Sequence, residues 1–340
     1  MSPEAPRRAA RCPLAEVDLR QEPQGHEIDA IATVGDLTFV IEWKSSGATA
    51  RVSAAAHQAR RCASELGGRA VPLVAVPFMG PVGRRLCQEV EVAWLDLSGN
   101  ARIFAPGIRV LIEGQPNRFK HAGRPSSAFA PKSARIARWL LMHPDRSAIQ
   151  REIAQETDVA EGFTSRIVSR LEADDLIVRE PNGAIRARDP ELLLDAWSEA
   201  YDFSKHDIHR GHVAARSGDA LLRRVADELE RRDERYAATG LAAAWLLTKW
   251  AGFRTVTVYI DKAPDADLRK RLGFREEEQG ANLWLTVPND EGVFAGAAEH
   301  HGVRCVHPVQ AYLDVKQHPE RAAEAAERLR RDFLSWGKSA

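Results

Sequence analysis

The sequence predicts an α/β chain that is divided into about two or three domains. Its 340 residues exceed the usual length of one domain, and 44% hydrophobic with 28% charged residues is ordinary for a globular protein. Runs of β-branched residues alternate with helical segments over residues 1–113, and a compact group of helices follows over residues 133–190. Strands and helices mix again over residues 191–340, which indicates an α+β C-terminal domain.

Composition limits the classes of protein to consider. No apolar run reaches 18 residues, so we expect no transmembrane helix and no membrane partner. The arginines near the N-terminus are not followed by an apolar segment, so we expect no secretory signal. The four scattered cysteines suggest buried thiols in a reduced, cytoplasmic protein. Because the net charge is zero, any nucleic-acid footprint must be local.

The stretch over residues 25–46 predicts a β-hairpin. Two runs rich in Val, Ile, Thr and Phe, residues 28–34 and 37–41, are separated by a short Gly-Asp turn. Asp29 lies on the first strand. Glu42 and Lys44 lie two apart at the end of the second, so their side chains leave the same face of the sheet.

Two carboxylates beside a lysine suit phosphoryl chemistry. Carboxylates are ligands for Mg²⁺ (or Mn²⁺), which activates water, while a lysine orients that water or stabilises developing charge. The pattern Asp29-x12-Glu42-x-Lys44 resembles the PD-(D/E)XK nucleases, whose fold is restriction-endonuclease-like, although Ile28 replaces the proline of the family name. Gln58 lies on a helix expected over residues 53–66, and a glutamine there resembles the same family's helix that follows Glu-x-Lys. The resemblance implies catalytic Asp29, Glu42, Lys44 and Gln58, a metal held by Asp29 and Glu42, and hydrolysis of DNA phosphodiester bonds.

Other interpretations of this stretch stay open. The Glu and Lys could form a solvated ion pair on a surface hairpin, or the fold could have lost catalysis and serve as a scaffold. Glu16 and Glu27 are either further metal ligands or solvated side chains.

The remaining elements of residues 1–113 fit the restriction-endonuclease-like order of strand, hairpin, helix, strand, helix, strand. We expect an edge strand over residues 16–19, strands over 70–77, 92–97 and 101–104, and a helix over 81–89. In the segment DLSGNARI, Asn100 and Arg102 either contact phosphate or belong to a structural turn.

Residues 114–132 predict a basic linker because they combine Pro, Gly and Ser with positive charge. No acidic residue occurs between the linker and Asp145. These cations either follow a phosphate backbone or belong to a solvated hinge; they are Arg118, Lys120, His121, Arg124, Lys132, Arg135 and Arg138.

Residues 133–190 predict three helices and a two-stranded wing. The helices are expected over residues 133–142, 148–156 (with Ser147 as cap) and 162–173, and the strands over 176–179 and 184–188. On the third helix, apolar residues are expected to face inward, and the outward set comprises Thr164, Ser165, Arg166, Ser169 and Arg170.

The segment REIAQETDVAEGFTSRIVSRLEADDLIVRE resembles the winged helix-turn-helix of MarR-like bacterial regulators. Such a motif places its second helix in the major groove of double-stranded DNA. The resemblance implies base contacts from Thr164, Ser165 and Arg166, with Ser169 on the same DNA-facing surface. It also implies phosphate contact from Arg170, and phosphate or minor-groove contacts from Arg186 and Arg188 in the wing. A winged helix used for protein contacts is the alternative.

The C-terminal segments YAATGLAAAWLL and VQAYLDVKQHPERAAEAAERLRR resemble the C-terminal domain of AbiEi antitoxins of type IV toxin–antitoxin systems. That family implies a DNA-binding repressor, with a nucleotidyltransferase-like toxin as a possible partner and a homodimer as a possible state. Before this region, His206, His209 and His212 recur at intervals of three, either as a zinc site on a helix or as a polar connector.

Two hypotheses follow. In the first, the protein binds DNA and cleaves it at a Mg²⁺-dependent PD-(D/E)XK site. In the alternative, it is an AbiEi-type antitoxin and transcriptional repressor whose nuclease-like domain is inactive.

Overall fold

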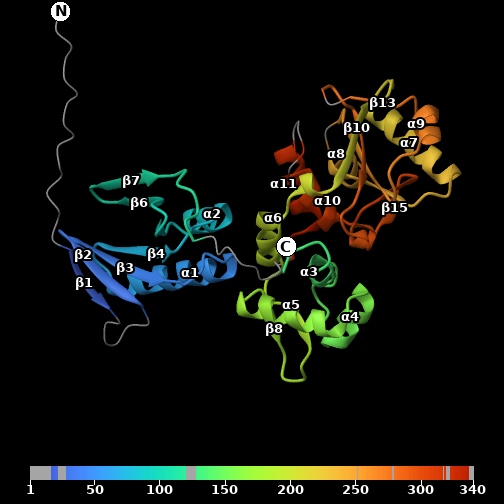
Figure 1. Ribbon diagram of the computed structural model, residues 1–340. Helices are drawn as coiled ribbons and strands as arrows, with labels where there is room; N and C mark the ends of the chain where they lie inside the picture. Colours follow the sequence, from blue (N-terminus) through green and yellow to red (C-terminus); the bar gives the residue numbers. More distant parts are fainter. Residues whose placement is uncertain are drawn as a thin grey trace, which may run out of the picture. The chain divides into compact units, whose positions relative to one another are not determined.

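The computed structural model describes residues 17–21, 28–119, 128–250, 252–277, 279–316, 318 and 322–336. The chain forms two compact units, Met1–Ala122 and Gly123–Ala340, and each is treated by itself below (Figure 1). No described helix is long and apolar enough to cross a lipid bilayer.

The first unit is built on a seven-stranded sheet whose strands follow each other in chain order. The first three strands form an antiparallel meander, the third to fifth are parallel, and the last three are antiparallel again. The strands are β1 (Val17–Gln21), β2 (Ala30–Val34), β3 (Leu37–Trp43), β4 (Ala70–Val76), β5 (Ala93–Asp96), β6 (Ala101–Ala105) and β7 (Ile108–Ile112).

Two helices provide the crossovers that parallel strands require: α1 (Thr49–Leu66) joins β3 to β4, and α2 (Pro81–Glu89) joins β4 to β5. One apolar cluster lies between these helices and the sheet and includes Val52, Met79 and Trp94. A second cluster, around Phe39 and Leu73, includes side chains from β2 to β7. The predicted elements of this unit are therefore present, with β7 as an unpredicted addition. The restriction-endonuclease-like assignment itself stays a prediction.

The second unit begins with the winged helix. Its elements are α3 (Ala134–Met142), α4 (Gln150–Thr157), α5 (Glu161–Ala173) and the hairpin of β8 (Ile177–Arg179) with β9 (Ile185–Ala187). One predicted detail was wrong: Ser147 does not cap α4, because its hydroxyl donates to Glu180 (2.7 Å) and the helix begins after Ile149. The backbone N–H of Ile149 instead donates to Glu152 (3.3 Å).

The rest of the second unit is a seven-stranded mixed sheet with helices. The strand order is β13-β10-β14-β12-β11-β16-β15. The strands are β10 (Asp207–His212), β11 (Tyr236–Thr239), β12 (Val256–Ile260), β13 (Arg275–Glu276), β14 (Leu283–Val287), β15 (Ala298–His300) and β16 (Val303–Cys305). The helices are α6 (Pro190–Ala200), α7 (Gly218–Arg231), α8 (Gly240–Thr248), α9 (Ala266–Leu272), α10 (Pro308–Val315) and α11 (Ala322–Phe333), with short 3₁₀ helices η1 (Phe203–Lys205) and η2 (Glu291–Phe294).

The passage from β11 into α8 depends on Gly240. Its φ is +57°, in the left-handed region that favours glycine, and a Cβ there would lie 2.7 Å from Nε2 of His318. The small residues of α8 are buried, and they allow α10 and α11 to pack against it. The predicted triple of histidines is not on a helix: β10 carries His209 and His212, so a helical zinc site there is wrong.

A polar network lies in the core of this domain around Asp314. Its carboxylate accepts from Tyr201, Thr239 and Gln310, the last at 2.8 Å. Burial raises the pKa of Asp314 to about 6, because the ionised form is desolvated even though the hydrogen bonds favour it. His206 Nδ1 accepts from the backbone N–H of Asn289 (3.1 Å), so the neutral imidazole carries its proton on Nε2, beside Tyr201.

Three histidines of this unit are held in the neutral form. Burial lowers the pKa of His206, His307 and His318 to about 4 in each case. In the unfolded chain a histidine has a pKa of about 6.5. The unfolded state therefore binds more protons between about pH 4 and 6.5, and stability must fall as the pH falls through that window.

We predict that lowering the pH from 7.5 to 5 destabilises the second unit by about 2 kcal/mol per histidine. Asp314 opposes this by about 1 kcal/mol, because its raised pKa makes the native state bind a proton more readily. Urea unfolding of the His206→Gln variant should show a smaller pH dependence than wild type. The exposed His212→Gln variant serves as the control and should keep the full dependence. If the free energy of unfolding depended on pH equally in His206→Gln and in wild type, His206 would not be one of the histidines that cause this dependence.

Candidate nucleic-acid interface

A three-residue turn joins α4 to α5. Asp158 ends α4 in the left-handed conformation (φ 52°), and its N–H bonds back to the helix. Val159 is buried in the turn, and Ala160 immediately precedes α5. This geometry fixes the angle between the two helices and thereby the position of α5, the expected recognition helix.

One face of α5 is buried and the other is open to solvent. Thr164, Ile167, Val168 and Leu171 form the buried face, at the i, i+3, i+4, i+7 spacing of a helical stripe. The expectation that Thr164 faces outward to contact bases was therefore wrong. Its side chain is 0% exposed, and its hydroxyl has no hydrogen-bond partner in the described part of the chain. Thr164 lies three residues before Ile167, so the helical repeat places it on the buried face although its side chain is polar.

The solvent-facing side of α5 presents the other predicted contacts. Arg166 and Ser169 are exposed and Ser165 is half-buried. The guanidinium of Arg166 lies 5.4 Å from the ring centre of Phe163, and no ion pair involving it occurs within the described residues. An exposed, uncompensated arginine in the first half of the helix suits recognition of a guanine edge.

The remaining predicted cations lie beside carboxylates. Arg170 is 3.9 Å from Asp174 at the end of α5. In the wing, Arg186 is 3.4 Å from Glu180 and Arg188 is 3.5 Å from Asp175. Exposed pairs of this kind contribute little to stability, so a phosphate could replace the carboxylate partner at small cost.

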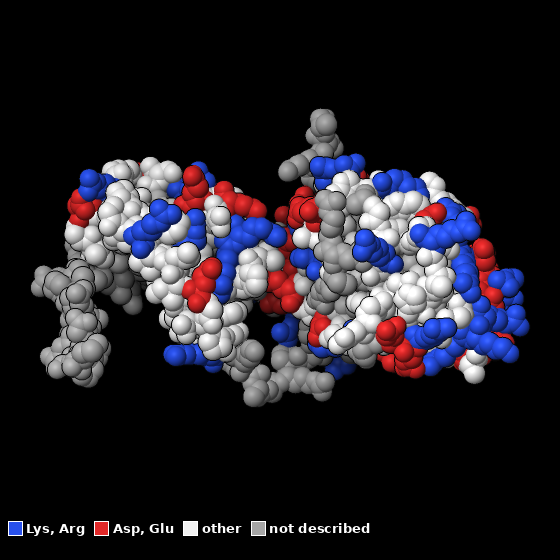
Figure 2. Space-filling view, turned by 90° about the horizontal axis from the view of Figure 1, so that it is seen from above, with Lys and Arg blue, Asp and Glu red and all other residues white. Residues whose placement is uncertain are grey.

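Two cations of the expected phosphate-tracking set are unavailable to DNA. Arg135 is only 12% exposed at its side chain and is bound to Asp290, and Arg138 is 4% exposed. Both lie on α3 and face the C-terminal domain, because helical spacing of three places them on one side. Lys120, His121 and Arg124 lie outside the described residues. Figure 2 shows positive and negative side chains intermingled on the visible face, in agreement with the zero net charge.

The first unit brings together three of the four predicted catalytic residues. Asp29 precedes β2, Glu42 is the last residue but one of β3, and Lys44 follows that strand. Lys44 Nζ lies 2.7 Å from Glu42 Oε2 and 3.4 Å from Asp29 Oδ2. Asp29 also accepts from the backbone N–H of Trp43 (2.8 Å). The lysine thus connects the two carboxylates.

Glu42 is unusual for a paired surface residue because it is 1% exposed. Burial raises the pKa of Glu42 against the lowering effect of Lys44, and its second oxygen, Oε1, has no hydrogen-bond partner among the described residues. A solvated ion pair is therefore the wrong description. The described residues contain no group of three or more His, Cys, Asp or Glu side chains placed to hold a metal ion, so two carboxylates are what this cluster offers.

The other predicted residues of this unit have mixed outcomes. Gln58 is half-buried on α1. Asn100 is 1% exposed, and its side chain bonds to Asp96 (2.9 Å) and to the backbone of Gln115 (2.9 and 3.1 Å), so the structural turn is the correct alternative. The guanidinium carbon of Arg102 lies 4.2 Å from the ring centre of Phe104. Glu16 and Glu27 lie outside the described side chains.

The second unit thus has the architecture of a DNA-reading winged helix joined to a mixed α/β domain. Comparison with family models agrees: residues 129–184 match the MarR family, and residues 186–335 match the model described as "Transcriptional regulator, AbiEi antitoxin, Type IV TA system". The first matched segment is thus similar to a MarR-family winged helix, and the second, called the AbiEi domain below, is similar to an AbiEi antitoxin domain. Neither match reaches the first unit. No curated protein matches the chain, and no solved structure does.

The main feature that the sequence did not reveal is the joint between the winged helix and the AbiEi domain. Arg135 forms a bidentate pair with Asp290 (2.8 and 2.9 Å) and also donates to the carbonyl of Thr157 (3.3 Å). Asp290 in turn caps η2 by accepting from Gly292 N–H (2.8 Å). The partners lie 155 residues apart, so no local pattern signals the pair.

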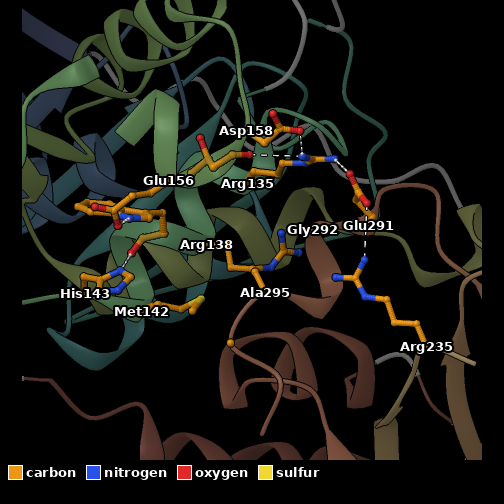
Figure 3. Close-up of a pocket in the computed structure, with 13 residues that line it drawn as sticks. Arg135, Arg138, Met142, His143, Glu156, Asp158, Arg235, Glu291, Gly292 and Ala295 are labelled. Atoms are coloured by element: carbon orange, nitrogen blue, oxygen red, sulfur yellow. Dashed lines mark hydrogen bonds and ion pairs between the residues drawn. The ribbon is translucent and has the colours of Figure 1, made fainter. Parts of the chain in front are cut away.

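We predict that Asp290→Asn lowers the free energy of unfolding of the second unit by about 1–3 kcal/mol. It removes the bidentate partner of the largely buried Arg135, which keeps only the exposed carboxylates of Glu291 (3.3 Å) and Asp158 (3.6 Å) (Figure 3). Chemical unfolding followed by tryptophan fluorescence would measure this. Arg223→Gln, which breaks an exposed i,i+4 pair with Asp219, is the matched control and should change stability by less than about 1 kcal/mol. A similar small loss in both variants would show that the joint is unimportant.

Proposed function

We propose that this protein is a DNA-binding transcriptional regulator of the antitoxin type. The observation that carries the proposal is the exposed face of α5, with Arg166 uncompensated, within a winged helix that is followed by an AbiEi antitoxin domain. Arg166 and Ser169 would lie in the major groove with Ser165 at the margin. Arg170, Arg186 and Arg188 would contact phosphate and position the helix.

We predict that Arg166→Ala weakens binding to the protein's own upstream DNA by roughly 5- to 150-fold, the usual loss for a base-reading arginine. A mobility-shift titration against specific and random duplexes would separate lost specificity from lost affinity. Thr164→Val is the matched control on the same helix. It removes only a buried hydroxyl without a partner and should keep wild-type affinity. If Arg166→Ala bound like wild type, α5 would not be the reading helix.

The wing supports a separable prediction. Arg188→Gln should weaken specific and random DNA by the same factor and reduce the slope of log affinity against log salt by about one, since it removes one phosphate contact. Measuring the titration at several salt concentrations gives that slope. A loss confined to the specific sequence would assign the wing to base recognition instead.

The antitoxin part of the proposal implies a protein partner. We infer a cognate toxin, of the nucleotidyltransferase-like kind that the AbiEi resemblance implies, and a homodimer as the DNA-binding state. The AbiEi domain is the surface available for these contacts. Co-expression with a neighbouring toxin gene, scored by relief of growth arrest, tests this part independently of DNA binding.

A second candidate function rests on the cluster of Asp29, Glu42 and Lys44. We propose that, if the unit is a PD-(D/E)XK domain, Asp29 and Glu42 hold Mg²⁺ or Mn²⁺, Lys44 orients the attacking water and Gln58 assists. The bound metal would activate water for phosphodiester hydrolysis. The buried Glu42 with an unpartnered oxygen favours this candidate, while the regulator has the broader support of two family matches.

We predict that any genuine Mg²⁺- or Mn²⁺-dependent cleavage of plasmid, linear or single-stranded DNA is lost in both Asp29→Ala and Lys44→Ala. DNA binding by the winged helix should remain in both variants. Cleavage that survives both substitutions would come from a contaminant. Absence of cleavage in wild type under either metal would leave a DNA-binding regulator with an inactive nuclease-like domain.

A further inference from the structure

The last strand of the first unit, β7, is an edge strand with an apolar surface. In the described part of the chain it pairs with β6 alone, and the register runs without a bulge (Figure 1). Leu111 is 59% exposed, the largest exposed fraction among the large hydrophobic side chains that the structure describes, and Ile112 is exposed as well. β7 contains no Lys or Pro, two residues that commonly prevent an edge strand from pairing. The strand therefore has the properties of an edge that accepts another strand.

Every second residue of β7 directs its backbone N–H and C=O groups away from β6. A two-residue turn joins the two strands, so Ala105 and Ile108 form the hydrogen-bonded pair that closes the hairpin. Hydrogen-bonded pairs alternate with non-hydrogen-bonded pairs along an antiparallel ladder. The backbone groups of Arg109, Leu111 and Glu113 therefore point to the open side of β7, where they can pair with another strand.

The charges along this edge are self-complementary. Arg109 lies two residues before Leu111 and Glu113 two residues after it. If two copies of β7 pair antiparallel about Leu111, the twofold symmetry places Arg109 of each copy opposite the partner's Glu113. Registers centred on Val110 or Ile112 would instead place Leu111 opposite Arg109 or Glu113 and would lose both charge pairs. The charge pattern thus favours one register, with the twofold axis at Leu111.

Both charged groups are available for such pairs. Arg109 forms no ion pair within the described residues, and its guanidinium carbon lies 4.6 Å from the ring centre of Phe104. The Glu113 side chain is 53% exposed, and its carboxylate lies 3.7 Å from Arg84. A contact of this length at the surface contributes little, and Arg84 also donates to the carbonyl of Met79 (3.0 Å). Glu113 can therefore accept a second arginine at small cost.

The same register continues the apolar face of the sheet from one copy to the next. Val110 lies opposite Ile103 of β6 and shares its face, and Ile103 packs against the second apolar cluster of this unit. Ile112 lies on that face too, because side chains alternate along a strand. Pairing about Leu111 places Val110 opposite the partner's Ile112 and removes exposed apolar surface from water. The apolar face and the charges therefore agree on one register.

We propose that β7 pairs antiparallel with β7 of a second copy of this chain, about a twofold axis at Leu111. The two seven-stranded sheets then form one continuous sheet, and Leu111 lies opposite its own copy. The contact belongs to the unit that neither family match reaches, and it depends neither on DNA binding nor on the antitoxin role. One pair of short strands is a small interface, so covalent trapping is the suitable measurement.

Leu111→Cys should trap this contact in the full-length protein. Opposed residues of a hydrogen-bonded antiparallel pair have Cα atoms about 5.5 Å apart, which is within the range of a disulfide. The substitution is made together with Cys12→Ser, because Cys12 lies outside the described residues and the other three cysteines are buried. Mild oxidation should then give a disulfide-linked dimer.

Phe104→Cys is the matched control, since Phe104 is exposed on the neighbouring strand β6. Its two copies would be separated by three strand spacings, at least about 14 Å, which is too far for a disulfide. Equal yields of cross-linked dimer from the two cysteine variants would overturn the proposal. Absence of a dimer in Leu111→Cys would also overturn it and would leave the edge to a different partner.

Charge reversal tests the register. In the Leu111→Cys protein, Arg109→Glu and Glu113→Arg should each lower the yield of dimer about fivefold or more, because two opposite-charge pairs become like-charge pairs. Both reversals in one chain restore the pairs and should restore the yield, which a folding defect would not do. A mixture of the two single reversals should also cross-link, because each chain then complements the other. Unchanged yields in the single reversals, or no recovery in the double reversal, would refute the register.

Discussion

The pair of Arg135 with Asp290 is the contact on which the arrangement of the second unit depends. From one turn of α3 the guanidinium reaches the carboxylate that caps η2 and the carbonyl that ends α4. A bidentate, largely buried pair is directional, so it fixes both the separation and the orientation of the two elements. Helix α4, which precedes α5, is thereby bonded to the AbiEi domain through the side chain of Arg135.

Arg138 lies one turn further along α3 and shows the opposite situation. Both arginines face the AbiEi domain, but one has a carboxylate partner and the other has only Gln310 and two unpaired nitrogens. Arg138 is followed on α3 by Trp139, whose indole N–H donates to Glu156 on α4 (2.8 Å). Because α4 leads by a three-residue turn into α5, these contacts of α3 also help to position α5.

Sequence reasoning predicted the elements whose local pattern agrees with their environment. The β-branched run of β3 and the apolar stripe of α5 are of this kind. β11 was not predicted because the two alanines of YAAT weaken its strand pattern, and it is a strand because it is buried between β12 and β16. Thr164 was misplaced because its polarity was weighed above its position in the helical repeat. The roles of Arg135 and Arg138 depend on partners more than 150 residues away, which spacing along the chain cannot indicate.

The cluster of Asp29, Glu42 and Lys44 can be understood from its charges. Two carboxylates and one ammonium leave a single net negative charge, and Lys44 Nζ already lies within 3.4 Å of both carboxylates. Those contacts raise the pKa of Lys44 despite its burial, so the lysine is a built-in counterion for the two carboxylates. A divalent ion would have to displace this ammonium from the carboxylates. Such a partly neutralised arrangement is compatible with a scaffold in a regulator. Catalysis would require Glu42 and Asp29 to bind the metal more favourably than they bind the ammonium of Lys44.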